Sequence, residues 1–186
     1  MLKKIGYIFL IVLTGISFVA CGKEKEVRKV QPPEQELMFL MTYDSYAYDE
    51  IHSASFITTD GKYLEVPEYI LGEHGEMPDD WAEQLIRLSE NTLVECTLPE
   101  DDLAVMYDFV NSVEIEDVPV FMEYADTIYD IGFDTLYLLK KETNGSYTQQ
   151  KLCISGQTNK CIKSDKVIDF CNFMRDKEYY RMYYPI

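Results

Sequence analysis

The chain has 186 residues, 47% of them hydrophobic and 13% aromatic, and its 33 acidic residues against 17 basic ones give a net charge of −16 at pH 7. This apolar content is too high for an intrinsically disordered chain, and the length suits one folded domain. A chain this acidic is repelled by nucleic-acid phosphates and by anionic lipid headgroups, which argues against nucleic-acid binding.

Residues 1–21 have the order of a secretory signal peptide. Lys3 and Lys4 form a short basic region, and an uncharged apolar run follows from Ile5 to Ala20. The run is shorter than the roughly twenty apolar residues that span a bilayer. A buried core helix fits poorly, because a run without a polar face would have to be covered on all sides. The sequence therefore predicts export from the cytoplasm.

The segment Phe18-Val19-Ala20-Cys21 resembles the lipobox of bacterial lipoproteins, with Phe18 where leucine is usual. The resemblance implies a diacylglyceryl group on the Cys21 sulfur and cleavage between Ala20 and Cys21. Two acyl chains hold a protein stably at a membrane, whereas one chain binds only marginally. We therefore expect a signal peptide over residues 1–20, a lipidated flexible tether over 21–36, and a single acidic domain over 37–186 that is anchored to the cell membrane and faces outside the cytoplasm.

Turn chemistry and periodicity predict the elements of the domain. Asp60-Gly61 and Asn144-Gly145 are both favoured pairs for a tight hairpin turn that needs positive φ. Apolar residues at helical spacing, with Pro99 and Ser164 suited to helix starts, predict three helices. In chain order we expect a strand over residues 37–41, a hairpin over 51–58 and 63–66, a loop over 67–79, a helix over 80–89, a short strand over 92–98, a helix over 99–113, an irregular stretch over 114–127, a hairpin over 131–141 and 147–155, a short strand over 161–163, a helix over 164–177 and an aromatic tail over 179–186.

These elements predict the fold class. Hairpins imply antiparallel pairing, and amphipathic helices must cover a face of the resulting sheet. The prediction is an α+β fold, with an antiparallel sheet built from β-hairpins and about three amphipathic helices packed on it. Two hairpins that are each followed by a helix also suggest a duplicated unit, although no residue identity supports a repeat.

Four cysteines remain when Cys21 is assigned to the lipid: Cys96, Cys153, Cys161 and Cys171. Cys153 and Cys161 flank a short polar loop, so a hairpin would place them opposite each other and within reach of a disulfide. Export permits such a bridge. The alternative is that all four are buried free thiols, which behave as small hydrophobic residues.

No residue set forms a recognised catalytic or metal-binding motif. His52 and His74 are the only histidines, and Ser53, Ser55 or Cys96 would have to partner one of them as a nucleophile. The stretch from Glu73 to Glu76, which includes His74, offers ligand atoms but lacks the spacing of known metal sites. The adjacent carboxylates at 79–80 and 101–102 are explained as helix starts. We therefore expect no catalytic residues, no bound metal and no cofactor.

Tyrosines gather in two stretches of the sequence, which are residues 43–48 and the C-terminal tail. Such surfaces suit contacts with proteins or glycans, because the ring offers area at low entropic cost and the hydroxyl forms hydrogen bonds. The alternative is that these tyrosines pack half-buried in strands and in the tail. The tyrosines concerned are Tyr43, Tyr46, Tyr48, Tyr179, Tyr180, Tyr183 and Tyr184.

Acidic residues dominate residues 34–135, where the only basic residues are Lys62 and Arg87. This stretch could be a docking face for cationic partners, or a solvated surface that keeps the protein soluble.

Taken together, the sequence predicts a membrane-anchored, non-enzymatic module that binds a protein partner or a glycan at the cell envelope. A small hydrolase-like envelope enzyme with an unrecognised active site is the alternative.

Overall fold

The computed structural model describes residues 30–45, 50–71, 77–92, 97–115, 119–124, 132–156 and 159–180. The elements in these ranges are, in chain order, β1 (Leu37–Ser45), β2 (Glu50–Thr58), β3 (Tyr63–Glu65), α2 (Trp81–Asn91), α3 (Glu100–Ser112), β4 (Phe121–Tyr124), β5 (Phe133–Lys141), β6 (Tyr147–Ser155), β7 (Asn159–Ile162) and α4 (Asp165–Asp176).

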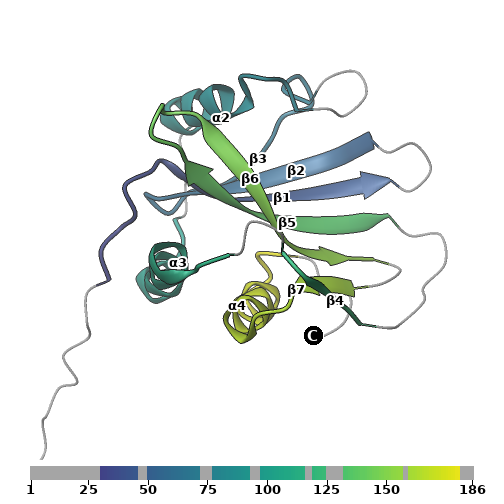
Figure 1. Cartoon of the computed structure of the whole chain (residues 1–186). Coiled ribbons are helices and arrows are strands. Elements are labelled where there is room, and N and C mark those ends of the chain that lie inside the picture. Colours follow the sequence, from purple (N-terminus) through teal and green to yellow (C-terminus); the bar gives the residue numbers. More distant parts are fainter. Residues whose placement is uncertain are drawn as a thin grey trace, which may run out of the picture.

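The seven described strands form one antiparallel sheet in the order β3-β2-β1-β5-β6-β7-β4 (Figure 1). Strands β1 and β5 pair at its centre, with Phe39 opposite Leu138. Strands β2 and β3 lie on one side of this pair, and strands β6, β7 and β4 lie on the other. The predicted α+β class is confirmed.

Both predicted hairpin turns are present. Gly61, between β2 and β3, has φ of 85°, and Gly145, between β5 and β6, has φ of 87°. Glycine adopts this left-handed conformation without the steric cost that a side chain imposes. The local turn chemistry therefore determines where the two hairpins reverse.

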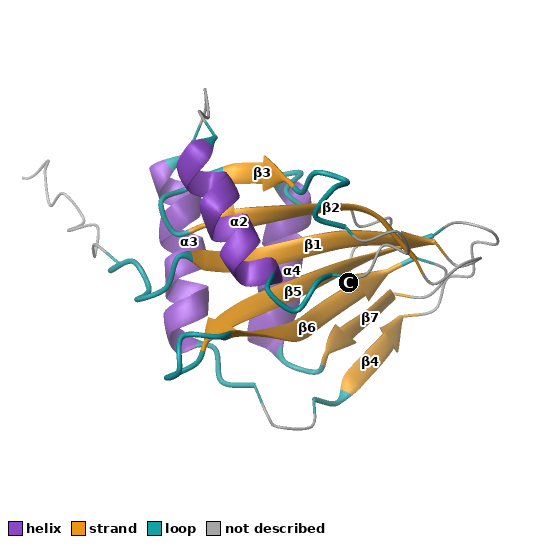
Figure 2. Cartoon of the chain, turned by 90° about the horizontal axis from the view of Figure 1, so that it is seen from above, coloured by secondary structure: helices purple, strands orange, loops and turns teal. Residues whose placement is uncertain are grey.

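The helices cover both faces of the sheet (Figures 1 and 2). Helices α3 and α4 lie on one face, and α2 lies on the other. The core on the first side is built around an aromatic group, in which the Phe170 ring of α4 stacks at 3.8 Å on Phe109 of α3 and at 4.9 Å on Phe39 of β1. A second core, with Leu40, Phe56 and Leu85 at 0% exposure, fills the space under α2.

Residues 31–36 lie against the domain, so the predicted tether over 21–36 is wrong at its C-terminal end. The Gln35 side chain donates to the Leu37 and Leu139 carbonyls at 2.7 and 2.8 Å. The Tyr147 hydroxyl accepts from the backbone N–H of Glu36 at 2.8 Å and donates to its carboxylate at 2.7 Å. These hydrogen bonds hold the entering chain beside the β5–β6 hairpin, and residues 35 and 36 are therefore part of the folded domain.

One other expectation needs correction, and another falls mostly outside the described residues. The stretch over 114–127 contains strand β4, which pairs with β7 at one edge of the sheet, because Pro119 precedes the strand and leaves its ladder intact. In the described part of residues 92–98 no strand is present, and residues 93–96 lie outside the described residues.

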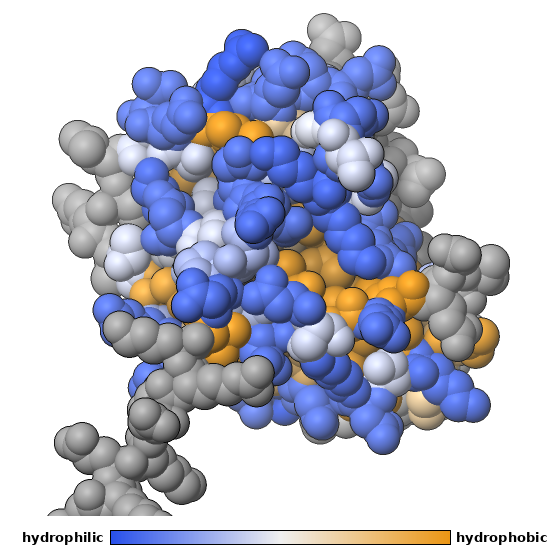
Figure 3. All heavy atoms as spheres, turned by 60° about the vertical axis from the view of Figure 1, so that its left-hand side comes forward, coloured by the Kyte–Doolittle hydropathy of each residue, from blue (hydrophilic) through white to orange (hydrophobic). Residues whose placement is uncertain are grey.

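Hydrophilic residues cover most of the face shown in Figure 3, with apolar residues visible between them. Tyr69 and Val120, at 78% and 59% exposure, are the most exposed of the large hydrophobic residues in the described ranges. Within those ranges, no helix has both the length and the apolar character needed to cross a membrane.

Candidate functional site

A cleft of about 420 Å³ lies beside strands β1, β2 and β3, and the segment that follows α4 forms part of its wall. We call it the tyrosine cleft. Its lining residues are Met41, Thr42, Tyr43, Ser53, Ala54, Ser55, Tyr63, Glu65, Val66, Asp134, Glu178, Tyr179 and Tyr180.

Strand register places the polar lining residues side by side. Tyr43 of β1 is opposite Ser53 of β2 on one side and opposite Asp134 of β5 on the other. Ser55 is opposite Glu65 of β3. Directly opposite residues share a face of the sheet, with Cβ atoms about 5 Å apart. The cleft therefore has a floor of hydroxyl and carboxyl groups that comes from four adjacent strands.

The end of α4 directs two tyrosines toward this floor. Glu178 has φ of 60°, the left-handed conformation in which helices often end. The backbone N–H groups of Tyr179 and Tyr180 then both donate to the carbonyl of Met174, at 2.9 and 3.2 Å. The Tyr180 hydroxyl donates to the Asp134 carbonyl at 2.7 Å, and its side chain is buried. This turn fixes where the chain leaves the helix and enters the wall of the cleft.

Asp102 of α3 fixes the other tyrosine. Its carboxylate accepts from the Tyr179 hydroxyl at 2.7 Å and from the Lys177 ammonium at 2.7 Å. Burial alone would raise the pKa of Asp102, but the hydrogen bonds from Lys177 and Tyr179 outweigh it and hold this pKa below its usual range. The carboxylate therefore stays charged and ties the segment after α4 to α3.

The cleft presents aromatic and acidic groups. The Tyr63 and Ser55 hydroxyls are 2.9 Å apart, and the rings of Tyr63 and Tyr179 lie 6.4 Å apart, centroid to centroid. Glu65 and Glu178 are exposed acids in the lining, and none of the described lining residues is Lys or Arg. Carboxylates and tyrosine ring faces both attract cations.

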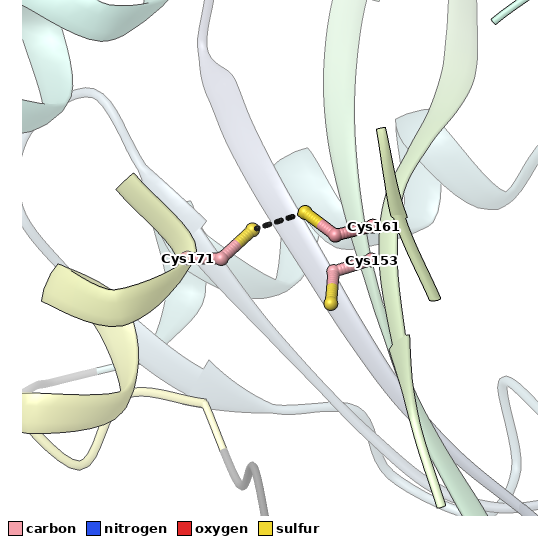
Figure 4. A group of neighbouring side chains, drawn as sticks. All are labelled: Cys153, Cys161 and Cys171. Carbon is pink, nitrogen blue, oxygen red and sulfur yellow. Dashed lines mark hydrogen bonds between the residues drawn. The ribbon is translucent and has the colours of Figure 1, made fainter. Parts of the chain in front are cut away.

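A second group, the cysteine cluster, lies in the core between the sheet and α4 (Figure 4). It consists of Cys153 of β6, Cys161 of β7 and Cys171 of α4, which are all 0% exposed. Their sulfur atoms all lie within 4.8 Å of one another, and those of Cys161 and Cys171 are 3.8 Å apart.

The predicted positions of Cys153 and Cys161 are confirmed, since they are directly opposite each other across β6 and β7. All three residues of the cluster are free thiols in the structure, so the disulfide between Cys153 and Cys161 is not formed there.

The three thiols influence one another's ionisation. The Cys161 thiol donates to the Cys171 sulfur, and hydrogen bonding with Cys153 and with Cys171 lowers the pKa of Cys161. The pKa values of Cys153 and Cys171 are raised, first by hydrogen bonding within the cluster and then by burial and by the charge of a neighbouring thiolate. Loss of a proton by one of these thiols therefore opposes ionisation of the other two.

The structure brings together only some of the residues singled out in the sequence. Tyr43, Tyr179 and Tyr180 all line the tyrosine cleft, together with Ser53 and Ser55 of β2. His52 lies in β2, but its side chain is outside the described residues. The other candidates that lie outside them are Cys21, Tyr46, Tyr48, Glu73, His74, Glu76, Cys96, Tyr183 and Tyr184.

Several lining residues were not singled out in the sequence, among them Tyr63, Glu65, Asp134 and Glu178. A signal for Tyr63 and Glu65 was available, because alternate positions of the β2–β3 hairpin are polar where a core-facing strand would be apolar.

Comparison of the chain with protein-family models, curated proteins and solved structures finds no match.

Proposed function

We propose that this protein is a membrane-anchored, extracytoplasmic binding module and that the tyrosine cleft is its ligand site. The anchor is supported by the lipobox pattern ending at Cys21. The binding role is supported by the cleft, where hydroxyl, carboxyl and aromatic groups from distant parts of the chain converge around about 420 Å³. A concave site with convergent polar groups is the usual form of a ligand pocket.

The chemistry of the lining favours a cationic ligand, such as a lysine- or arginine-bearing segment of a protein partner. Glu65 and Glu178 are exposed acids, and Tyr63 presents a partly exposed ring beside them. A cation over a tyrosine face contributes about 0.5–1 kcal/mol at an exposed site, and an exposed ion pair contributes about 0.2–1 kcal/mol. Each contact is weak, so affinity would come from several of them acting together.

The charge of the domain supports the same ligand class. The acidic surface attracts cationic ligands over several ångströms and raises their association rate. It also repels an anionic membrane surface. The lipid anchor therefore keeps the domain near the membrane, although the domain itself does not adhere to the membrane. Residues 21–30 connect the anchor to the ordered chain and reach at most about 35 Å, at about 3.5 Å per residue.

A binding measurement on the full lipidated chain in detergent micelles tests this proposal. The probe is a fluorescent lysine-rich peptide, and an uncharged oligosaccharide serves as the comparison ligand. The cleft variant carries Glu65→Gln and Glu178→Gln. Its control carries Glu114→Gln and Glu142→Gln, which remove the same charge from exposed positions outside the cleft.

The cleft variant should bind the peptide about five- to tenfold more weakly, which corresponds to about 1–1.4 kcal/mol for two exposed ion pairs. The control should change affinity by less than about twofold, through the general field alone. Equal loss in both double variants would show that only net charge matters. Preferential binding of the oligosaccharide would reject the cationic ligand class.

A further inference from the structure

The cysteine cluster is used by neither the anchor nor the tyrosine cleft. Its sulfur atoms come from three separate elements, β6, β7 and α4, and converge on one point in the core. Packing alone needs only that each thiol find apolar neighbours. Convergence of three thiols within 4.8 Å of one another is a more specific arrangement.

The spacing of the sulfurs matches a metal-thiolate site. A metal–sulfur bond of about 2.3 Å requires sulfur–sulfur separations of about 3.8 Å in tetrahedral geometry and about 4.0 Å in trigonal geometry. The Cys161 and Cys171 sulfurs are 3.8 Å apart, and the remaining separations do not exceed 4.8 Å. Small side-chain rotations would therefore place all three sulfurs at bonding distance from one ion.

We propose that Cys153, Cys161 and Cys171 form a buried site for a thiophilic metal ion, either Zn²⁺ or Cu⁺. Soft thiolate ligands select these ions over Mg²⁺ and Ca²⁺, which prefer oxygen. Each sulfur that still carries a proton gives it up as it bonds to the ion, so binding releases up to three protons and leaves a tris-thiolate complex. Such a site needs no oxidant or reductant.

Complete burial gives the site a structural role. The three cysteines are 0% exposed, so a bound ion would have no coordination position open to solvent. The ion would join α4 to the β6–β7 edge of the sheet. Tyr180, which follows α4, has its hydroxyl 3.5 Å from the Cys153 carbonyl and 2.7 Å from that of Asp134. A metal here would therefore strengthen the attachment of the segment that forms the cleft wall.

Metal titration of the full lipidated chain, in detergent and without oxygen, tests the site. The probes are Zn²⁺ and Cu⁺ in separate experiments, and the readouts are bound metal per chain, released protons and X-ray absorption at the metal edge. The variants are Cys153→Ala, Cys161→Ala and Cys171→Ala, and Cys96→Ser is the control. Circular dichroism establishes that each variant is folded, and a destabilised variant is replaced by the corresponding Cys→Ser change.

One ion per chain should bind, with three sulfur ligands at about 2.3 Å. Cu⁺ should show three sulfurs alone, and Zn²⁺ should add a fourth, lighter ligand that the protein supplies, because the buried site has no position open to solvent. Each cluster variant should bind roughly 100-fold more weakly or worse, since loss of even an outer-shell partner costs 10- to 100-fold, and Cys96→Ser should bind normally. Substoichiometric binding, equal binding by the cluster variants, loss of binding in Cys96→Ser, or a disulfide between Cys153 and Cys161 in the isolated protein would overturn the proposal. These outcomes are independent of peptide binding at the cleft.

Discussion

Removal of the Lys177 ammonium should destabilise the protein more than neutralisation of its partner Asp102. The Asp102 side chain is 6% exposed, whereas that of Lys177 is 47% exposed. Lys177→Met leaves a buried carboxylate that only the Tyr179 hydroxyl still compensates. Breaking a fully buried pair costs about 3–5 kcal/mol, and the half-exposed position of Lys177 together with the remaining hydrogen bond reduces the expected loss to about 2–4 kcal/mol.

Asp102→Asn should cost less, about 1–2 kcal/mol. The amide keeps the shape and can still accept from Tyr179, and the freed ammonium of Lys177 is exposed enough to be hydrated by water. The double variant Asp102→Asn/Lys177→Met should be more stable than Lys177→Met alone, because it contains no uncompensated buried charge. Such non-additivity is the signature of direct coupling between two residues.

The pH dependence gives an independent check. The folded-state pKa of Asp102 lies below its unfolded value, so its contribution to stability is complete above about pH 4 and is lost as the pH falls through the folded pKa. In Lys177→Met the opposing cation is absent and burial raises this pKa. The deficit of the variant relative to the wild type should therefore shrink on acidification.

Urea denaturation at several pH values, followed by circular dichroism, measures these differences. If Asp102→Asn proves more damaging than Lys177→Met, or if the deficit of Lys177→Met grows as the pH falls, then the assignment of Asp102 as a charged, buried anchor is wrong.

Three further predictions concern the anchor, the core and the entering chain. Cys21→Ser should release the protein from the membrane fraction as uncleaved precursor; mature-length protein still in that fraction would contradict lipidation. Phe170→Ala removes the ring that stacks at 3.8 Å on Phe109 and should cost about 3–5 kcal/mol in urea denaturation, and a loss below about 1 kcal/mol would contradict its central place in the core. Tyr147→Phe removes the hydroxyl bound to Glu36, so amide exchange near that residue should accelerate about fivefold, for a loss of about 1 kcal/mol, and unchanged exchange would contradict the docking of residues 31–36.

Local signals predicted most of the elements. Asp60-Gly61 and Asn144-Gly145 located both hairpins, because their turn conformation depends on the residues in the turn itself. The starts of α3 and α4 followed from Pro99 and Ser164 for the same reason. Neither start is closed by a side-chain hydrogen bond, so backbone preference rather than capping determines these positions.

The core and the cleft depend on contacts between distant residues, and they were harder to predict. Apolar periodicity predicted the helices α3 and α4, but it did not indicate that Phe109 and Phe170 would form the closest ring stack in the described core. Their role emerges only when the two helices are placed side by side. Tyr180 is similar, because its burial depends on the turn at Glu178.

Only part of the cysteine cluster could be predicted from the sequence. The pairing of Cys153 with Cys161 followed from the hairpin register. The approach of Cys171 did not, because the docking of α4 on the sheet depends on the whole apolar face of that helix. The tether was misassigned for a related reason, since the partners of Gln35 and Glu36 are on β5 and β6, more than a hundred residues away.

Mapping of a bound cationic peptide by nuclear magnetic resonance tests the central claim most directly. Titration of the lysine-rich peptide into the isotope-labelled protein should shift the resonances of the cleft residues Tyr43, Ser53, Ser55, Tyr63, Glu65, Glu178 and Tyr179. Resonances of α2, on the opposite face of the sheet, should stay unchanged. Shifts spread evenly over the acidic surface, or concentrated around α2, would contradict the tyrosine cleft as the binding site.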